Sequence, residues 1–111
     1  MGKSNVSGEY QEKLREDAEV SKVVGVNLRR LRKATKTPEG KKITFDRLAK
    51  LTALNRLSIW RFECGRSGMT VATLVRLREA LDCSWDDLLG GCESKIVKER
   101  KKFSGEIVRG K

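Results

Sequence analysis

The chain lacks histidine, contains one proline and three cysteines, and draws only 5% of its 111 residues from the aromatic types. Without histidine it lacks the commonest general base of enzymes, and no P-loop, GxSxG or GxGxxG motif is present. The cysteines form no CxxC pair, which argues against a disulfide framework or a zinc site. We therefore expect no enzyme activity, no cofactor, no bound metal, and thiols that are buried or idle.

Long apolar runs are also missing. No stretch approaches the roughly 20 apolar residues that cross a bilayer, and the N-terminus lacks the apolar region of a signal peptide. We expect a soluble, cytoplasmic protein.

What the chain has in excess is positive charge, with 25 basic and 15 acidic residues and a net charge of +10. This charge suits DNA, RNA or an anionic membrane surface, or it is simply a solvated basic surface, and by itself it does not choose among them.

Charge and composition divide the chain into three segments. Residues 1–22 carry four basic and five acidic side chains, and we expect disorder over 1–8, then a helical extension or dimer contact. Residues 23–91 form the predicted folded domain. Residues 92–111 form a basic tail that we connect with dimerisation, and its pattern suits a helix at 96–103 and a short strand at 106–109.

Five stretches show helical spacing or helix-capping residues and predict an all-α domain. They are residues 21–34, 44–51, 56–63, 71–81 and 85–89. Polar residues suited to N-capping stand at the start of four of them: Thr44, Asn55, Thr70 and Ser84, the last in a capping box with Asp87. Apolar side chains are expected to form the core: Val24, Leu28, Leu31, Leu48, Ala49, Leu54, Ile59, Phe62, Val71, Leu74, Leu77, Leu81 and Trp85.

The helices predicted at 44–51 and 56–63 are separated by a short turn, which is the helix-turn-helix layout. In that layout the first helix crosses the DNA backbone, and the second places its N-terminal half in the major groove. On the second helix Leu57 lies almost opposite the apolar face, Trp60 and Arg61 flank it, and Arg56 lies at the border.

Over about residues 24–90 the chain resembles a known family, the Cro/C1-type (XRE-type) helix-turn-helix regulators. The matching residues are Leu28-Arg29-Arg30-Leu31-Arg32, Leu48-Ala49, Leu54, the run from Asn55 to Gly65, Thr73-Leu74, Leu77, Ala80-Leu81 and the run from Trp85 to Leu89. The most specific part is the spacing of Ala49, Ile59, Glu63 and Gly65. The resemblance implies a compact five-helix, lambda repressor-like DNA-binding domain, here with N- and C-terminal extensions, and a salt bridge between Arg32 and Glu63.

The resemblance also implies which residues contact DNA. Base contacts fall on Arg56, Leu57 and Arg61, because arginine can bond guanine O6 and N7 together and leucine can contact a thymine methyl. Backbone contacts are expected from residues on or beside the two helices: Thr44, Arg47, Asn55, Ser58, Trp60, Arg66, Ser67, Lys41 and Lys42. Two alternatives stay open, since the arginines can hold phosphate or lie in solvent, and the outward apolar side chains can form a protein interface.

The chain departs from the family pattern in three places. The loop at 35–42 is longer than usual, which adds Lys36, Lys41 and Lys42 as candidate phosphate contacts. Phe45 stands where the family often has glutamine, which puts the usual anchor of that helix in doubt and leaves the role to Thr44 or Arg47. The third departure is Met69, where the family often has proline.

We therefore expect a transcriptional regulator, a repressor that binds double-stranded DNA as a homodimer through contacts in its C-terminal half. A close alternative is an antitoxin, which uses the same kind of domain and a separate segment to hold a toxin partner. A protein-interaction adaptor is a further alternative, although it has no need of Arg56 and Arg61 on the outward face. The last alternative is non-specific coating of nucleic acid by the basic tail. We expect no membrane partner.

Overall fold

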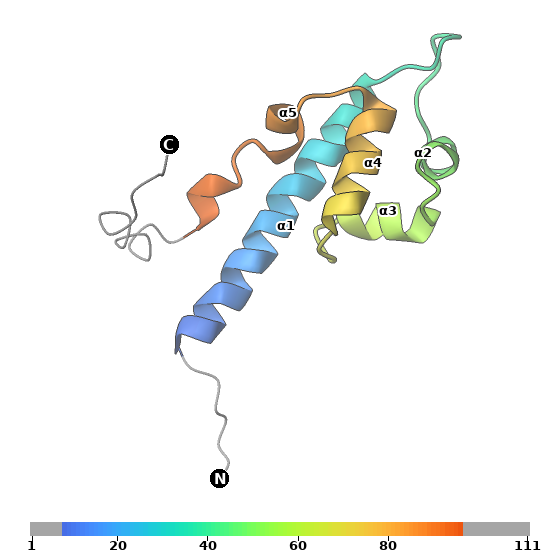
Figure 1. Ribbon diagram of the computed structural model, residues 1–111. Coiled ribbons are helices and arrows are strands. Elements are labelled where there is room, and N and C mark those ends of the chain that lie inside the picture. The colour runs from blue at the N-terminus through green and yellow to red at the C-terminus, as the bar shows by residue number, and fades with distance from the viewer. Residues whose placement is uncertain (1–7, 97–111) are drawn as a thin grey trace, which may run out of the picture.

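The computed structural model describes residues 8–96 and shows an all-helical protein, as predicted (Figure 1). Its elements are α1 (Gly8–Ala34), α2 (Phe45–Thr52), α3 (Arg56–Glu63), α4 (Val71–Leu81), α5 (Trp85–Leu89) and the 3-10 helix η1 (Glu93–Lys95). Among the described residues, β-type pairing is limited to an isolated antiparallel bridge between Lys36 and Lys42. None of the helices in this range combines the length and the apolar character that a membrane span requires.

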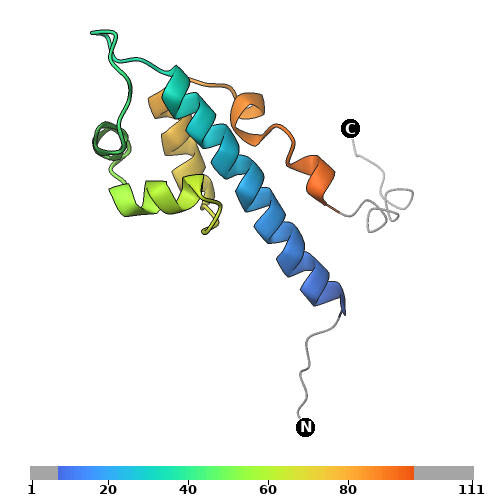
Figure 2. The same cartoon turned by 180° about the vertical axis from the view of Figure 1, so that it is seen from behind.

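Helix α1 is the central element. Seen from the front and from behind, it lies between α5 on one side and the pair α2 and α3 on the other (Figures 1 and 2). Val24 and Leu28 on its predicted stripe are buried. Its contact with α3 depends on Gly25, since a Cβ there would collide with the carbonyl oxygens of Phe62 and Glu63. Glycine inside a helix costs about 1 kcal/mol relative to alanine, and the close packing against α3 offsets that cost.

The first helix is longer than the predicted 21–34. One uninterrupted helix of 27 residues runs from Gly8 to Ala34, so its predicted start at Ser21 was wrong. The helical character expected beyond residue 8 is confirmed. Residues 9–22 contain neither glycine nor proline, so nothing stops the helix there, and Lys13 pairs with Asp17 at 2.9 Å across one turn.

The core lies where the apolar faces of the helices meet around α1. Nine hydrophobic side chains are buried in it: Val24, Leu28, Ile43, Leu48, Ile59, Phe62, Leu77, Leu81 and Leu88. The four predicted N-caps are confirmed, because each side chain accepts a backbone N–H of the helix that it opens: Thr44, Asn55, Thr70 and Ser84. The capping box of α5 is confirmed in both directions, since the Asp87 carboxylate also accepts the backbone N–H of Ser84.

Two residues expected in the core lie on the surface instead. Trp85 is 40% exposed, because Leu88 takes the buried position of the short helix α5. The guanidinium carbon of Arg78 lies 5.2 Å from the centre of the Trp85 ring. Val71 is 74% exposed, because at about 3.6 residues per turn it lies roughly a third of a turn from the buried Leu77.

Three predictions concern the ends of the chain. The disorder expected over residues 1–8 lies outside the described residues, except for Gly8, which begins α1. The helix expected at 96–103 lies outside them apart from Ile96, which follows η1. The strand expected at 106–109 lies wholly outside them.

Candidate nucleic-acid interface

Helices α2 and α3, each of eight residues, are joined by a tight turn. Ala53 ends α2 with a φ of 60°, in the left-handed region, and its N–H donates to the carbonyl of Ala49. Asn55 then accepts the N–H of Leu57 at 2.7 Å and starts α3. The predicted short turn between two capped helices is confirmed. The left-handed conformation costs an alanine about 1 kcal/mol, so the surrounding packing must hold this turn in place.

The inner face of α3 is anchored to α1. Ile59 is fully buried and Phe62 is 8% exposed. At the end of the helix, Glu63 accepts hydrogen bonds from Arg32 Nε at 2.5 Å and from Arg32 Nη2 at 3.0 Å. The two side chains keep only 5% and 13% of their surface exposed. The pair implied by the family resemblance is thus a two-pronged, charge-assisted contact, and its cation compensates a carboxylate placed unfavourably at a helix C-terminus.

Phe45, the residue that departs from the family pattern, packs against the same arginine. Its ring centre lies 4.2 Å from the guanidinium carbon of Arg32, which is within cation–π range. The side chain is half-buried and packs against the core. Arg32 therefore fixes two elements at once, namely the start of α2 through Phe45 and the end of α3 through Glu63.

The outer face of α3 carries large exposed side chains. Leu57 is 49% exposed and Trp60 is 40% exposed, and Arg56 and Arg61 are exposed as well. The four predicted outward residues of this helix therefore lie together on the surface. Arg56 Nη1 lies 3.2 Å from Asp46 Oδ1 on α2. An exposed pair of this kind adds little stability, but it orients the guanidinium group.

The segment that follows α3 contacts the outer face of this helix. Gly65 ends the helix with a φ of 72°, and a Cβ there would crowd the backbone of Lys22 on α1. The next residue, Arg66, places its guanidinium carbon 5.4 Å from the centre of the Trp60 ring. Ser67 follows and is half-buried. A cation thus covers one side of the exposed indole.

The other expected backbone contacts are spread over α2, α3 and the loop before them. The Thr44 hydroxyl accepts the N–H of Arg47 at 3.1 Å, and the Arg47 side chain is exposed. Ser58 is half-buried on α3. Lys41 and Lys42 are exposed on a loop that extends away from the helices (Figure 1). The structure therefore brings the residues of α2 and α3 together and sets the two lysines apart from them.

The positive charge of the chain is unevenly distributed. Residues 41–66 carry seven basic and two acidic side chains, and one of the acidic ones, Glu63, is neutralised in the ion pair with Arg32. Residues 79–93 carry five acidic side chains and no basic one. This distribution of charge along the chain favours a polyanion at α2 and α3 over one at α5.

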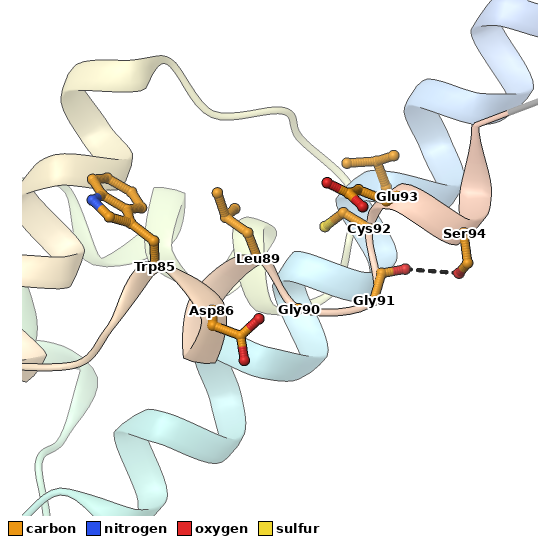
Figure 3. A pocket seen from close by; sticks show the side chains of 9 residues that line it. Trp85, Asp86, Leu89, Gly90, Gly91, Cys92, Glu93 and Ser94 are labelled. Atoms are coloured by element: carbon orange, nitrogen blue, oxygen red, sulfur yellow. Dashed lines mark hydrogen bonds between the residues drawn. The ribbon is translucent and has the colours of Figure 1, made fainter. Parts of the chain in front are cut away.

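A separate hollow of about 930 Å³ lies beside α5 and η1. Figure 3 shows Trp85, Leu89 and the carboxylates of Asp86 and Glu93 around it. Burial raises the pKa of the Cys92 thiol in its wall, which keeps the thiol protonated and weakly nucleophilic at neutral pH. Within residues 8–96, no three histidine, cysteine, aspartate or glutamate side chains are grouped to hold a metal. The mixture of carboxylates and apolar side chains does not suit a polyanion.

Sequence reasoning missed Asn27, which ties α5 to α1. The side chain is buried, and its Nδ2 donates to the carbonyls of Leu88 at 2.9 Å and Gly90 at 3.0 Å. Arg30 donates in turn to Asn27 Oδ1 at 3.1 Å. The signal was present, because Asn27 follows Val24 by about one turn on the apolar stripe, and a buried polar group requires partners.

It also missed the pairing of Asp46 with Arg56. Asp46 lies in the first turn of α2, but which residue of α3 it meets depends on how the two helices cross.

No known family model and no curated protein sequence matches the chain significantly. What the chain binds is therefore inferred from its own residues and their geometry.

Proposed function

We propose that this chain is a sequence-specific, double-stranded DNA-binding transcriptional regulator built on a Cro/C1-type helix-turn-helix domain. The observation that carries the proposal is the division of α3 into two faces, with Ile59 buried and with Leu57 and Trp60 exposed among arginines. A helix of this length rises about 12 Å, and the major groove admits one helix. Helix α3 can enter the groove while it keeps its contacts with α1.

Three side chains on α3 read bases in this proposal. Arg56 and Arg61 each offer the forked set of donors that matches guanine O6 and N7, and Leu57 offers an apolar contact. Arg56 forms an ion pair with Asp46 at 3.2 Å and has five N–H donors, so donors remain available to a base. The Asp46 carboxylate attracts the guanidinium group toward α2, and both side chains stay more than half exposed.

Contacts with phosphates hold the domain on the duplex. Arg47 on α2 and Arg66 after α3 are exposed cations beside the reading helix, and Lys41 and Lys42 are exposed on the loop that extends away from it. Each neutralised phosphate releases a counterion and adds about 0.9 to the slope of log affinity against log salt concentration. These contacts supply affinity without sequence preference, and the base contacts of α3 supply the preference.

A single reading helix covers few base pairs, so we propose that the chain binds as a homodimer to two half-sites about 34 Å apart. The C-terminal half is suited to the dimer contact. Trp85 is 40% exposed there, next to a hollow lined by Leu89 and Cys92. This surface lies on the opposite side of α1 from α3 (Figures 1 and 2), so pairing through it leaves both reading helices free. Bound at an operator, such a dimer acts as a repressor.

The test is selection of bound sequences from a pool of random duplexes at physiological salt concentration. We expect enrichment of a palindrome with half-sites one helical turn apart. If no sequence is enriched and binding only follows the salt concentration, sequence-specific binding is refuted.

The Arg61→Ala variant sharpens the test. It should lose about 1–3 kcal/mol of affinity at one base position and relax specificity there. Arg15→Ala is the matched control, because it removes the same charge from the part of α1 that projects beyond the other helices (Figure 1). The control should select the same sequence as the parent protein. An equal loss on every sequence in Arg61→Ala would mean that Arg61 holds phosphate only.

A further inference from the structure

An apolar notch opens on the outer face of α3. It is lined by Phe45 from α2 and by Leu57 and Trp60 from α3, and Arg56 is the polar residue at its wall. Leu57 and Trp60 are three residues apart and therefore neighbours on the helix surface. Phe45 is the first residue of α2, so the notch exists only because the two helices cross at this point.

Contacts with charged groups hold the walls of the notch. The Phe45 ring packs on Arg32 at 4.2 Å, and the Trp60 ring lies 5.4 Å from the guanidinium carbon of Arg66. Arg56 is held by Asp46 at 3.2 Å. These contacts restrain the rings of Phe45 and Trp60, so less side-chain entropy is lost when a group enters the notch.

The surroundings of the notch favour a nucleic acid over an apolar protein surface. On and directly beside α2 and α3 the basic side chains are Arg47, Lys50, Arg56, Arg61 and Arg66, and the acidic ones are Asp46 and Glu63. Of the two acidic groups, Glu63 is neutralised by Arg32. A group that enters the notch must therefore be apolar itself and attached to a strongly negative molecule.

We propose that the notch receives the C5-methyl group of a thymine exposed in the major groove, an inference that rests on the proposed DNA binding. Among the four standard bases, only thymine presents a methyl group on that edge. Beside the methyl, thymine carries the acceptor O4, whereas cytosine carries the N4 amino donor. Arg56 has donors only, so it complements thymine and opposes 5-methylcytosine, which would bring a donor against a donor.

This assignment gives Phe45 a role. A glutamine at this position would put a polar amide in the wall of the notch, whereas the phenyl ring completes an apolar wall opposite Leu57. Phe45, Leu57 and Trp60 are thus specificity-determining residues for a pyrimidine methyl group. Arg56, at the wall of the notch, donates to O4 of the same thymine, and Arg61 reads a neighbouring position.

The test uses the duplex selected by the full chain and replaces each thymine of one half-site in turn by uracil, which removes the methyl group and keeps the base pair. We expect one position at which uracil weakens binding about fourfold, the effect of one methyl group removed from water. At that position, a G·C pair with 5-methylcytosine should bind no better than one with cytosine. Equal binding of the 5-methylcytosine and thymine duplexes would overturn the assignment to thymine.

Two leucine variants assign the effect to the notch. Leu57→Ala should bind thymine and uracil duplexes equally, because the methyl group has lost its wall. Leu51→Ala is the matched control, since Leu51 is 52% exposed on α2 and does not line the notch, and it should keep the fourfold preference. If sequence-specific binding is intact but no thymine is preferred over uracil, the notch assignment fails and the proposed function stands. If no sequence is selected at all, both fail.

Discussion

Helices α3 and α5 enter the fold through the same local turn. Helix α2 ends at Ala53 with a φ of 60°, and helix α4 ends at Asp82 with a φ of 50°. In both cases one half-buried residue follows, and then an N-cap, Asn55 in one and Ser84 in the other. By local geometry alone, the chain therefore contains two helix-turn-helix units.

Each unit also presents a tryptophan in the same state. Trp60 and Trp85 are both 40% exposed, and an arginine guanidinium carbon lies 5.4 Å from the Trp60 ring centre and 5.2 Å from the Trp85 ring centre. The difference is the surrounding charge, which is basic over residues 41–66 and acidic over residues 79–93. The turn and the exposed aromatic ring are therefore common to both units, and the charge along the chain is what distinguishes α3 from α5.

The largest expected effects concern the contacts that hold α3 and α5 to α1. Glu63→Ala leaves Arg32 nearly buried without its partner and should lower the free energy of unfolding by about 3 kcal/mol or more. Asn27→Ala removes the donor to the carbonyls of Leu88 and Gly90 and should cost less, about 2 kcal/mol. Urea titration followed by circular dichroism measures both values. A larger loss in Asn27→Ala would mean that α5, and not α3, is the more firmly anchored unit.

The two tryptophans should separate DNA binding from self-association. Trp60→Ala should weaken binding to a half-site duplex about tenfold, or about 1.4 kcal/mol, and leave the oligomeric state unchanged. Trp85→Ala should shift the protein toward monomer and leave half-site binding within about twofold. Fluorescence anisotropy and analytical ultracentrifugation provide the two readouts. Equal loss of DNA affinity in both variants would show that the charge around each ring is not what distinguishes them.

The caps of the two units should differ in their response to pH. Asn55→Ala and Ser84→Ala should each cost about 1 kcal/mol of stability at neutral pH. In the capping box, the backbone N–H of Ser84 lowers the pKa of the Asp87 carboxyl below its ordinary value. The stability from a depressed pKa is present above the unfolded-state pKa and is lost as the pH falls through the folded-state pKa.

The stability difference between the parent protein and Asp87→Ala should therefore shrink in acid, below the ordinary pKa of aspartate. The penalty of Asn55→Ala should stay constant over the same range, because that cap contains no carboxylate. Urea unfolding at neutral and acidic pH measures both differences. A difference for Asp87→Ala that does not change with pH would contradict the capping-box contact.

The smallest expected effect concerns the two left-handed residues. Ala53→Gly should raise the free energy of unfolding by about 0.5–1 kcal/mol, because glycine adopts positive φ without a Cβ clash. Asp82→Gly should change stability less, since aspartate tolerates the left-handed region better than alanine does. Thermal unfolding of the two variants tests the ranking, and a greater gain at Asp82 would reverse it.

Apart from the Arg32–Glu63 pair, which the family resemblance implied, the features that sequence reasoning predicted correctly are local ones. The N-caps of α2 to α5 involve a side chain and a backbone N–H two or three residues apart, so the pattern itself contains both partners. The buried stripe of α1 follows in the same way from spacing. The start of α1 was predicted wrongly although the sequence contains no stop signal over residues 9–22. The exposure of Val71 and Trp85 was predicted wrongly because it depends on which side of α4 and α5 the neighbouring helices cover.

The helical character of residues 8–96, the starts of α2 to α5 and the two faces of α3 follow from the amino-acid pattern alone. The packing of Phe45 on Arg32, the pairing of Arg56 with Asp46 and the notch that Phe45 shares with Leu57 do not. The residues in each of these contacts are far apart along the chain. Each of these contacts joins residues that lie on different helices, and which side chains meet is set by the positions at which the helices cross.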